Sequence, residues 1–511
     1  MINFQSFQSA CQHYGVVPVT KQVLADFHTP VSLLNRFCRD ENGTNFSAAH
    51  QTKIKEGLFL LESAEGGEKW GRYSFLGIEP YCFVNIEAND VVVRYERPSA
   101  ASVENQRIPH NGKPLNVLRE LMKQYNTDEH PELPRFWGGL VGFFNYETAA
   151  FFEKIPHKLK DEPLACFVIP RTLLILDNIK QTLTICVLTF PSPGSTHSAA
   201  DDWKQLYQSA LAEIDRVAAE LEKPLATPQP EKTEEMTLES CYSEQEFRKR
   251  VGIVKEHIKN GDIIQCVLSQ PFIAENAPNP VPLYRALRFV NPAPYLFFMN
   301  IGGTTLVGSS PETMVRLEGK TATLRPIAGT RKRGETEQHD RELADEMLQD
   351  TKERAEHLML VDLGRNDLGR IAKTGTVQVT DLMFIERYAH VMHLVSNVTA
   401  ELDSGYDGFD LFEAAFPAGT LTGAPKIRAM QIIAGQEDFP RRAYGGAAGY
   451  ISFSGNIDFA ITIRTAMIQN GKLTVQAGAG VVYDSVPESE RKESVNKALG
   501  IARALKLLSG E

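Results

Sequence analysis

The sequence predicts an α+β fold in which antiparallel strands pack against helices that lie outside them. Residues 449–482 contain three strand-like runs separated by Ser-Gly-Asn and Gln-Asn-Gly, tripeptides typical of hairpin turns. Two long helical patterns lie in the same half of the chain, over residues 340–363 and 488–508. Strands that pair as sequence neighbours, with helices segregated from them, are typical of the α+β class.

The chain has 511 residues, enough for about two to four folding units or one large fused core. Apolar residues recur at helical spacing over 203–221, which predicts a helix there. Residues 223–240 combine three prolines with several charges, so we expect a linker or exposed loop. We therefore divide the chain into residues 1–222, 223–240 and 241–511.

Composition excludes several classes of protein. Hydrophobic residues make up 42% and charged residues 23% of the chain, and the net charge is −10, which disfavours a nucleic-acid partner. No apolar run approaches the roughly 18 residues of a membrane span, and the start lacks a secretory signal. The seven cysteines form no Cys-x-x-Cys pair. We expect a cytoplasmic protein with reduced core thiols and no membrane partner.

Alternation in the middle strand of the predicted meander separates two faces. Phe459, Ile461 and Ile463 lie on an apolar face, and Ala460, Thr462, Arg464 and Ala466 lie on a small, polar one. Because Arg464 is the only charge on that face, it is the candidate for gripping a carboxylate.

Four glutamates form two pairs with helical spacing. Glu353 and Glu356 share one face of the first long helix, and Glu490 and Glu493 share one face of the second. Two such pairs could hold a magnesium ion, which prefers oxygen ligands. Flanking lysines and arginines leave the alternative of two ordinary solvated helix faces.

Other candidates carry weaker signals. Gly478 and Gly480 at a strand end, and Gly329 with Thr330, could present backbone N–H groups to an anion, although each could equally mark a bulge or turn. Thr420 adds a hydroxyl in a loop before a helix. Glu312 in a Ser-Pro-Glu turn and His393 in a strand-like run are possible acid–base groups, with a common turn and a core histidine as the alternatives.

Several short segments of the chain closely resemble segments of the large subunit (component I) of anthranilate synthase, in the chorismate-utilising enzyme family. Eleven matching strings occur in the family's order, among them LLESA (60–64), GDIIQCVLSQ (261–270), NPAPYLFF (291–298), GSSPE (308–312), RPIAGTRKRG (325–334), KERAEHLMLVDLGRND (352–367), FPAGTLTGAPKIRAM (416–430), YGGAAGY (444–450), QAGAGVVYDS (476–485) and ESERKESVNKA (488–498).

The resemblance implies a central antiparallel β-sandwich flanked by helices, and conversion of chorismate and ammonia to anthranilate and pyruvate, the first step of tryptophan biosynthesis. It implies Glu356 and Glu493 as magnesium ligands, supported by Glu353 and Glu490. Glu312 resembles the general acid and His393 the histidine of pyruvate loss. The implied chorismate pocket consists of Gly329, Thr330, Thr420, Tyr444, Arg464, Gly478, Ala479, Gly480 and Lys497.

Two positions separate the members of the family. Members that use water carry lysine where this chain has Gln265, and an amide cannot act as that base. Aminodeoxychorismate synthases typically carry lysine where this chain has Ala328, and that lysine can act as a nucleophile. Both residues favour attack of ammonia at C2. Aminodeoxychorismate synthase remains the nearest alternative.

The resemblance also implies a partner and an inhibitor. No cysteine sits in a Gly-x-Cys-x-Gly elbow, so ammonia from glutamine must come from a separate amidotransferase small subunit. Residues 1–222 would be a regulatory region and residues 241–511 the chorismate-binding catalytic region. The implied tryptophan site consists of Glu62, Ser63, Asn291, Pro292, Ala293, Pro294 and Tyr295, with a plain core strand as the alternative for the first two. A non-catalytic tryptophan-binding protein is the rival from another class.

Overall fold

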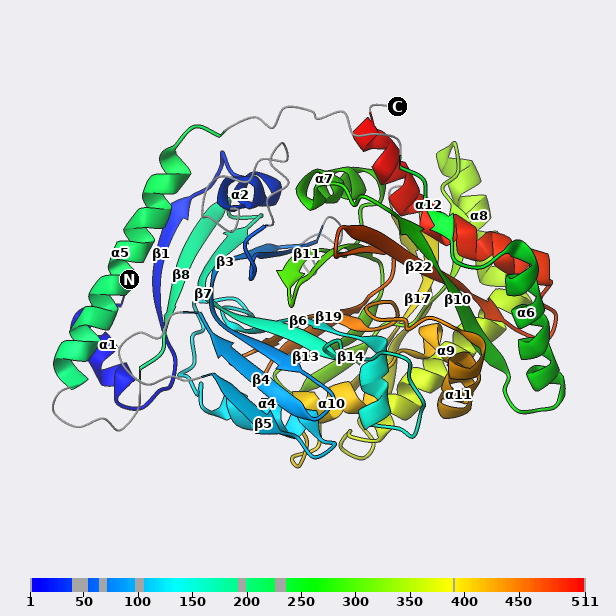
Figure 1. The fold of residues 1–511 in the computed structure, drawn as a ribbon, viewed down its shortest axis with the longest axis horizontal. Coiled ribbons are helices and arrows are strands. Elements are labelled where there is room, and N and C mark those ends of the chain that lie inside the picture. Colours follow the sequence, from blue (N-terminus) through cyan, green and yellow to red (C-terminus); the bar gives the residue numbers. More distant parts are fainter. Residues whose placement is uncertain are drawn as a thin grey trace.

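The computed structural model describes residues 2–38, 54–63, 71–96, 105–191, 199–225, 236–388 and 391–509. It confirms an α+β fold built on antiparallel strands (Figure 1). The strands are β1 Val17–Leu24, β2 Phe59–Glu62, β3 Tyr73–Ile86, β4 Asp90–Tyr95, β5 Gln106–Pro109, β6 Gly139–Phe144, β7 Ala165–Asp177, β8 Thr182–Thr189, β9 Glu239–Ser240, β10 Gln265–Ala274, β11 Tyr295–Ile301, β12 Thr304–Ser310, β13 Thr313–Glu318, β14 Thr321–Leu324, β15 Ile327–Lys332, β16 Gln378–Arg387, β17 Val391–Glu401, β18 Gly423–Ala424, β19 Ala447–Ser452, β20 Ile457–Ile461, β21 Thr465–Gln469 and β22 Lys472–Val481.

The helices pack mainly on the outside of these strands. They are α1 Phe4–Cys11, α2 Pro30–Phe37, α4 Pro114–Lys123, α5 Ala199–Glu222, α6 Glu244–Lys259, α7 Pro280–Val290, α8 Glu337–Gln349, α9 Thr351–Gly369, α10 Gly408–Ala415, α11 Lys426–Gln436 and α12 Pro487–Ser509, with short 3-10 turns η2 Tyr146–Phe151 and η3 Gly419–Leu421. Within the described ranges, no helix has both the length and the apolar character that crossing a membrane requires.

The strands form two layers joined at one side. One layer follows the pairing order β1–β8–β7–β3–β2–β11–β12–β21–β22–β10, and the other runs from β7 through β6, β19, β20, β13 and β14 to β17. The long strands β3 and β7 belong to both layers, and register shifts between Gly77 and Cys82 bend β3 between its two sets of partners. Figure 1 shows β11 and β22 lying across from β6, β19 and β13.

Strands from both halves of the chain share these layers. Strand β2 pairs with β11, and β6 pairs with β19. Between the halves, helix α5 confirms the predicted helix, residues 226–235 of the expected linker lie outside the described residues, and β9 pairs with the edge of β10. The described parts of residues 1–222 and 241–511 therefore pack in one continuous β-structure.

Two predicted elements are each divided in the structure. The single helix expected over 340–363 is two helices, because the carboxylate of Asp350 accepts hydrogen bonds from the backbone N–H of Lys352 and Glu353 and starts α9. The middle strand of the predicted meander is also two strands, β20 and β21, and the break falls at Arg464, whose φ is +50°. The chain passes from one layer to the other at that break.

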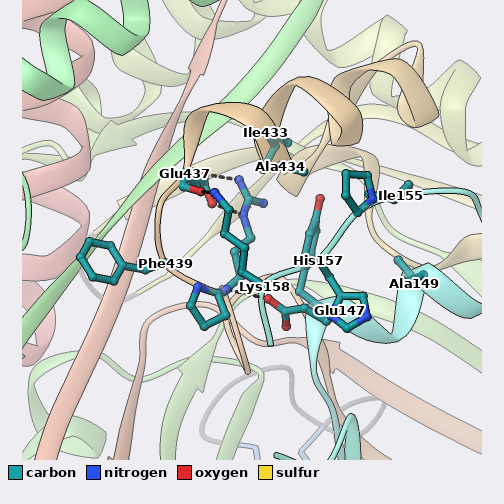
Figure 2. A pocket seen from close by; sticks show the side chains of 14 residues that line it. Glu147, Ala149, Ile155, His157, Lys158, Ile433, Ala434, Glu437 and Phe439 are labelled. Carbon is teal, nitrogen blue, oxygen red and sulfur yellow. Dashed lines mark hydrogen bonds and ion pairs between the residues drawn. The ribbon is translucent and has the colours of Figure 1, made fainter. Parts of the chain in front are cut away.

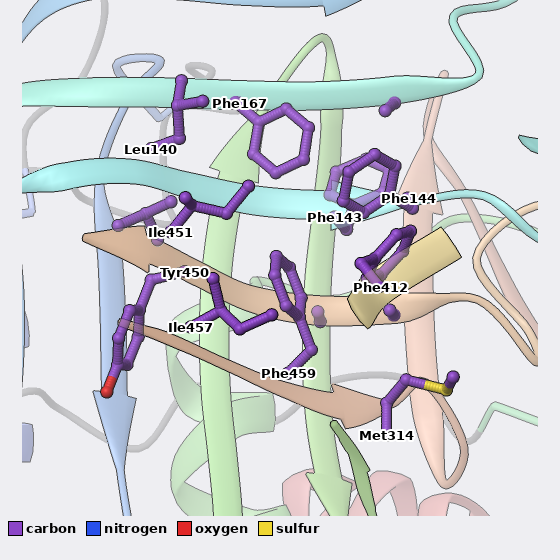
Figure 3. Packing of buried hydrophobic residues seen from close by; sticks show 14 of the residues in the cluster. Leu140, Phe143, Phe144, Phe167, Met314, Phe412, Tyr450, Ile451, Ile457 and Phe459 are labelled. Atoms are coloured by element: carbon purple, nitrogen blue, oxygen red, sulfur yellow. The ribbon is translucent and has the colours of Figure 1, made fainter. Parts of the chain in front are cut away.

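Aromatic rings fill the core beside the second layer (Figure 3). The rings of Phe144 and Phe412 are stacked with centroids 4.2 Å apart, and Phe459 lies 5.7 Å from Phe144. All three are nearly or fully buried. This packing joins β6, β20 and α10 into one rigid support. All seven cysteines lie in described ranges and six of them are buried, as expected for core thiols.

Candidate active site

Helices α9 and α12 bring the four predicted carboxylates together. Burial raises the pKa of Glu356, and the nearby charges of Glu353 and Glu493 raise it further. Burial also raises the pKa of Glu490, again with help from Glu493. Carboxylates of α9 and α12 are therefore near enough to influence one another's pKa.

The donor set fits a hard cation without forming a closed cage. Across the residues that the structure describes, no group of three or more His, Cys, Asp or Glu is close enough to hold a metal ion. Glu353 is already paired with Arg331, at 3.1 Å. Magnesium usually keeps water or substrate oxygens and binds one or two protein carboxylates, so an open, all-oxygen arrangement is chemically suitable for it. Magnesium remains a prediction.

Gln265 lies beside these carboxylates at the start of β10. Its Nε2 donates a hydrogen bond of 3.3 Å to Oε1 of Glu356. The side chain is buried and is covered by Gly480 of β22, where an added Cβ would lie only 2.7 Å from Nε2. Glycine at position 480 therefore leaves the space that the amide occupies.

The strand that carries Gly478, Ala479 and Gly480 forms one wall of the site. A Cβ at Gly478 would lie 2.6 Å from the carbonyl oxygen of Leu268 and 2.9 Å from the hydroxyl of Tyr444. Because neighbouring strand residues face opposite ways, the buried Ala479 side chain points away from that space, and only its backbone can contribute. Lys497 donates to the carbonyl of Gly478 at 3.0 Å and pairs with Glu493 at 2.7 Å.

Glu312 lies between β12 and β13 in the turn that the sequence predicts. Burial raises the pKa of its carboxyl to about 8, against the opposing effects of the Thr420 hydroxyl and the positive charges of Arg464 and Lys497. These three residues therefore lie around Glu312, although they come from distant parts of the chain. At neutral pH most of the Glu312 population carries a proton.

Arg464 is held in the gap between the two layers. Its backbone is left-handed and lies between the end of β20 and the start of β21, so Arg464 belongs to neither layer. Burial lowers the pKa of its guanidinium, and Glu312 and Tyr388 oppose that shift. A half-buried cation beside an acid that is largely protonated at neutral pH suits an anionic ligand.

His393 of β17 is fixed through one nitrogen. Its Nδ1 lies 3.0 Å from the carbonyl oxygen of Gly329 and 3.0 Å from Oγ1 of Thr330. Burial lowers its pKa to about 4, so the ring is neutral at pH 7. We assign the proton to Nδ1, which donates to the Gly329 carbonyl. This leaves the buried Nε2 as an acceptor with no hydrogen-bond partner among the described residues.

The two segments predicted to bind tryptophan meet in the structure. Strands β2 and β11 pair, with Glu62 opposite Leu296. Ser63 follows β2 directly, and Ala64 of the LLESA string lies outside the described residues. Oε1 of Glu62 accepts hydrogen bonds from the Tyr284 hydroxyl at 2.5 Å and from Nε of Arg288 at 2.8 Å. Sequence reasoning missed Tyr284 and Arg288, although both lie on the helix directly before the NPAPYLFF string.

The second predicted segment connects toward the chorismate site. Asn291 donates to Oγ of Ser309 at 3.2 Å, and the backbone N–H of Ser309 donates to the carbonyl of Arg464 at 3.2 Å. Tyr295 donates to Asp458 at 2.9 Å. Ala293 is buried, whereas Pro292 and Pro294 are half-buried. Ser309 therefore lies between the candidate inhibitor segment and the residue that would bind a substrate carboxylate.

Comparisons with known proteins agree with this geometry. Residues 65–503 match the family of chorismate binding enzymes. The chain is 42% identical over 498 residues to anthranilate synthase component 1 of Acetivibrio thermocellus, covering 96% of each chain. It is 41% identical over 520 residues to the same component of Aquifex aeolicus, covering 99% of this chain and 98% of the relative.

Solved structures give the same result. Anthranilate synthase component I from Streptococcus pneumoniae superposes with a TM-score of 0.73 at 34% identity, covering 86% of this chain and 95% of its own. The menaquinone-specific isochorismate synthase of Escherichia coli shares the fold, with a TM-score of 0.68 at 19% identity over 98% of both chains. The chain therefore belongs to the chorismate binding enzyme family, among relatives that are component 1 proteins of anthranilate synthase.

Proposed function

We propose that the protein is the large subunit of a magnesium-dependent anthranilate synthase, which converts chorismate and ammonia to anthranilate and pyruvate. The observation that carries this proposal is the buried carboxyl of Glu312, whose pKa burial raises to about 8 and which lies near the cations Arg464 and Lys497. Chorismate has two carboxylates and a poor leaving group, so it needs both cations and a positioned acid.

In the first step, ammonia forms a bond to C2, the ring double bonds shift, and the C4–O bond breaks. Glu312 supplies the proton with which the hydroxyl leaves as water. Its pKa of about 8 keeps that proton available near neutral pH, where an ordinary glutamate would have lost it. Arg464 and the backbone N–H groups around Gly478 would hold a carboxylate in place meanwhile.

In the second step, a proton leaves C2, the ring C–O bond to the side chain breaks, and the enolpyruvate becomes pyruvate by taking up a proton. Nε2 of His393 is suited to accept the C2 proton, because Nδ1 is occupied by the Gly329 carbonyl. The hydrogen bond to Gly329 also fixes the direction of the ring.

Glu356 and Glu493 would hold the magnesium ion, with Glu353 and Glu490 close by. Bound there, the ion would neutralise one substrate carboxylate. Burial, and after it the charges of Glu353 and Glu493, raise the pKa of Glu356. A bound cation would oppose both effects, which supports this role.

Gln265 and Ala328 support ammonia as the nucleophile and C2 as its target. The amide of Gln265 is directed at Glu356 and cannot act as a base for water. Ala328 is buried and has no nucleophilic group, which argues against the aminodeoxychorismate synthase alternative.

A separate amidotransferase small subunit would supply ammonia from glutamine, and tryptophan would inhibit by binding around Glu62, Ser63 and residues 291–295. The component 1 names of the relatives support a second component. We also propose a cytoplasmic location.

The test is incubation of the purified chain with chorismate, Mg²⁺ and ammonium, followed by identification of the product. We expect fluorescent anthranilate, and glutamine should replace ammonium only when the partner subunit is added. A para-substituted amino product would favour aminodeoxychorismate synthase. No turnover of chorismate at all would contradict an enzymatic role.

A further inference from the structure

A buried ion pair lies behind the wall of the chorismate site. Nη2 of Arg441 lies 2.6 Å from Oε1 of Glu437, and its Nε lies 2.8 Å from Oε2, so the pair is bidentate. Arg441 is 3% exposed and Glu437 is 4% exposed. Glu437 directly follows α11, and Arg441 lies in the loop that leads to Tyr444 and β19.

The same guanidinium holds two backbone segments of the site. Its Nη1 donates to the carbonyl of Leu421 at 2.7 Å, and its Nη2 donates to the carbonyl of Val267 at 2.8 Å. Leu421 follows Thr420, which lies beside Glu312. Val267 is paired with Gly480 across β10 and β22. The planar guanidinium of Arg441 therefore donates four hydrogen bonds in fixed directions, which the single ammonium group of a lysine cannot reproduce.

Glu437 anchors the next residues of the same strand. Its Oε1 accepts hydrogen bonds of 2.8 Å from both the backbone N–H and the hydroxyl of Ser269. Ser269 is paired with Gly478. The ion pair thus contacts β10 at the positions opposite both Gly478 and Gly480.

Two tyrosine rings also contact Arg441. Its guanidinium carbon lies 4.6 Å from the centroid of the Tyr146 ring and 5.5 Å from that of Tyr444. The Tyr444 hydroxyl is the group that a Cβ at Gly478 would meet at 2.9 Å. Arg441 therefore contacts the one aromatic residue of the predicted chorismate pocket.

Two small pockets have Arg441 in their lining. A pocket of about 40 Å³ is lined by Glu147, His157, Lys158, Glu437 and Arg441 among others (Figure 2). A second pocket, of about 20 Å³, is lined by Arg441, Tyr444, Thr462 and Gln476 among others. Arg441 therefore borders both the pocket near Glu147 and the one beside Tyr444.

We propose that Arg441 is a positioning residue for chorismate turnover. Together with Glu437 it fixes Thr420, Tyr444 and the Gly478–Gly480 strand relative to one another. This inference rests on the proposed function, because the distances that it controls matter only if the site acts on chorismate.

The test compares Arg441→Lys with Arg36→Lys. Arg36 of α2 is also buried, and its guanidinium also bonds two backbone carbonyls, those of Glu220 at 2.6 Å and Lys223 at 2.7 Å. It lies outside the candidate site. Both variants keep the positive charge and lose the planar guanidinium, so the chemical change is the same at the two positions. For each, kcat and the KM for chorismate are measured with ammonium and Mg²⁺, alongside the thermal midpoint.

We expect Arg441→Lys to raise KM and to lower kcat/KM about 100-fold, since misplacement of a site by about 1 Å has that effect. Arg36→Lys should keep wild-type kinetics at a similar loss of thermal midpoint. Equal kinetics in the two variants would overturn the inference. If Arg441→Lys does not fold, Ser269→Ala is compared with Gln476→Leu. Ser269→Ala removes the hydrogen bond to Glu437 and the one that the hydroxyl accepts from Gln476, whereas Gln476→Leu removes only the second. A several-fold larger loss of kcat/KM in Ser269→Ala supports the inference, and equal kinetics in the two variants overturn it. Absence of turnover in the wild type and in Arg36→Lys would instead overturn the proposed function.

Discussion

Replacing Gly480 by alanine should displace Gln265 while leaving the fold intact. The added Cβ would lie 2.7 Å from Nε2 of Gln265, whereas ordinary contacts begin at 3.4 Å, so the amide must move by 3.4 − 2.7 = 0.7 Å. Its hydrogen bond to Glu356 is already long at 3.3 Å and should break. A hydrogen bond to a charged group contributes about 1.5–3 kcal/mol, and misplacement by about 1 Å can lower turnover about 100-fold.

The assay measures kcat/KM for chorismate with ammonium, together with the thermal midpoint. We expect Gly480→Ala to lose between about 10-fold and 100-fold in kcat/KM with a small change in midpoint. Gly252→Ala is the control, because a Cβ added there on α6 would have no atom within 4 Å among the described residues outside the neighbouring backbone of its own helix. It should keep full activity and stabilise the helix by about 1 kcal/mol. Wild-type kinetics in Gly480→Ala would refute the view that the amide's position matters.

Three further results are expected. Turnover should decline as pH rises through about 8, because the acid form of Glu312 is lost there. Glu312→Gln should abolish that decline and lower kcat about 10²–10⁴-fold. A decline that persists in the variant would assign it to another group. Glu356→Gln and Glu493→Gln should each abolish Mg²⁺-dependent turnover with an unchanged circular dichroism spectrum, so turnover with the wild-type Mg²⁺ dependence would exclude that residue as a ligand. Ser63→Phe should relieve inhibition by tryptophan and leave kcat without tryptophan unchanged; equal inhibition constants in variant and wild type would place the regulatory site elsewhere. In the wild type, chorismate should weaken tryptophan binding by the same factor by which tryptophan weakens chorismate binding, typically a coupling of about 1–3 kcal/mol.

The link between the two candidate sites gives the last of these results a structural basis. Ser309 contacts Asn291 through its side chain and Arg464 through its backbone N–H. A ligand that shifts residues 291–295 would therefore act on the segment that holds Arg464. Coupling of this kind requires that the ligand bind the two arrangements differently.

Local patterns in the sequence determined the elements and the chemical types at the site. Spacing of three placed Glu353 with Glu356 and Glu490 with Glu493, and each pair does lie within one turn of one helix. The Ser-Pro-Glu string placed Glu312 in a turn between strands. These features depend on residues a few positions apart, which is why they can be read without the fold.

The tertiary structure alone decided how those residues act. No local pattern reveals that the meander strand breaks at Arg464, because the break follows from pairing with two different layers. The pKa of Glu312 depends on burial by segments far away in the chain, and the hydrogen bonds of Arg441 join residues up to 294 positions apart, as with Glu147. Periodicity and turn chemistry are local, whereas burial, electrostatics and cross-strand contact are produced only when distant segments pack together.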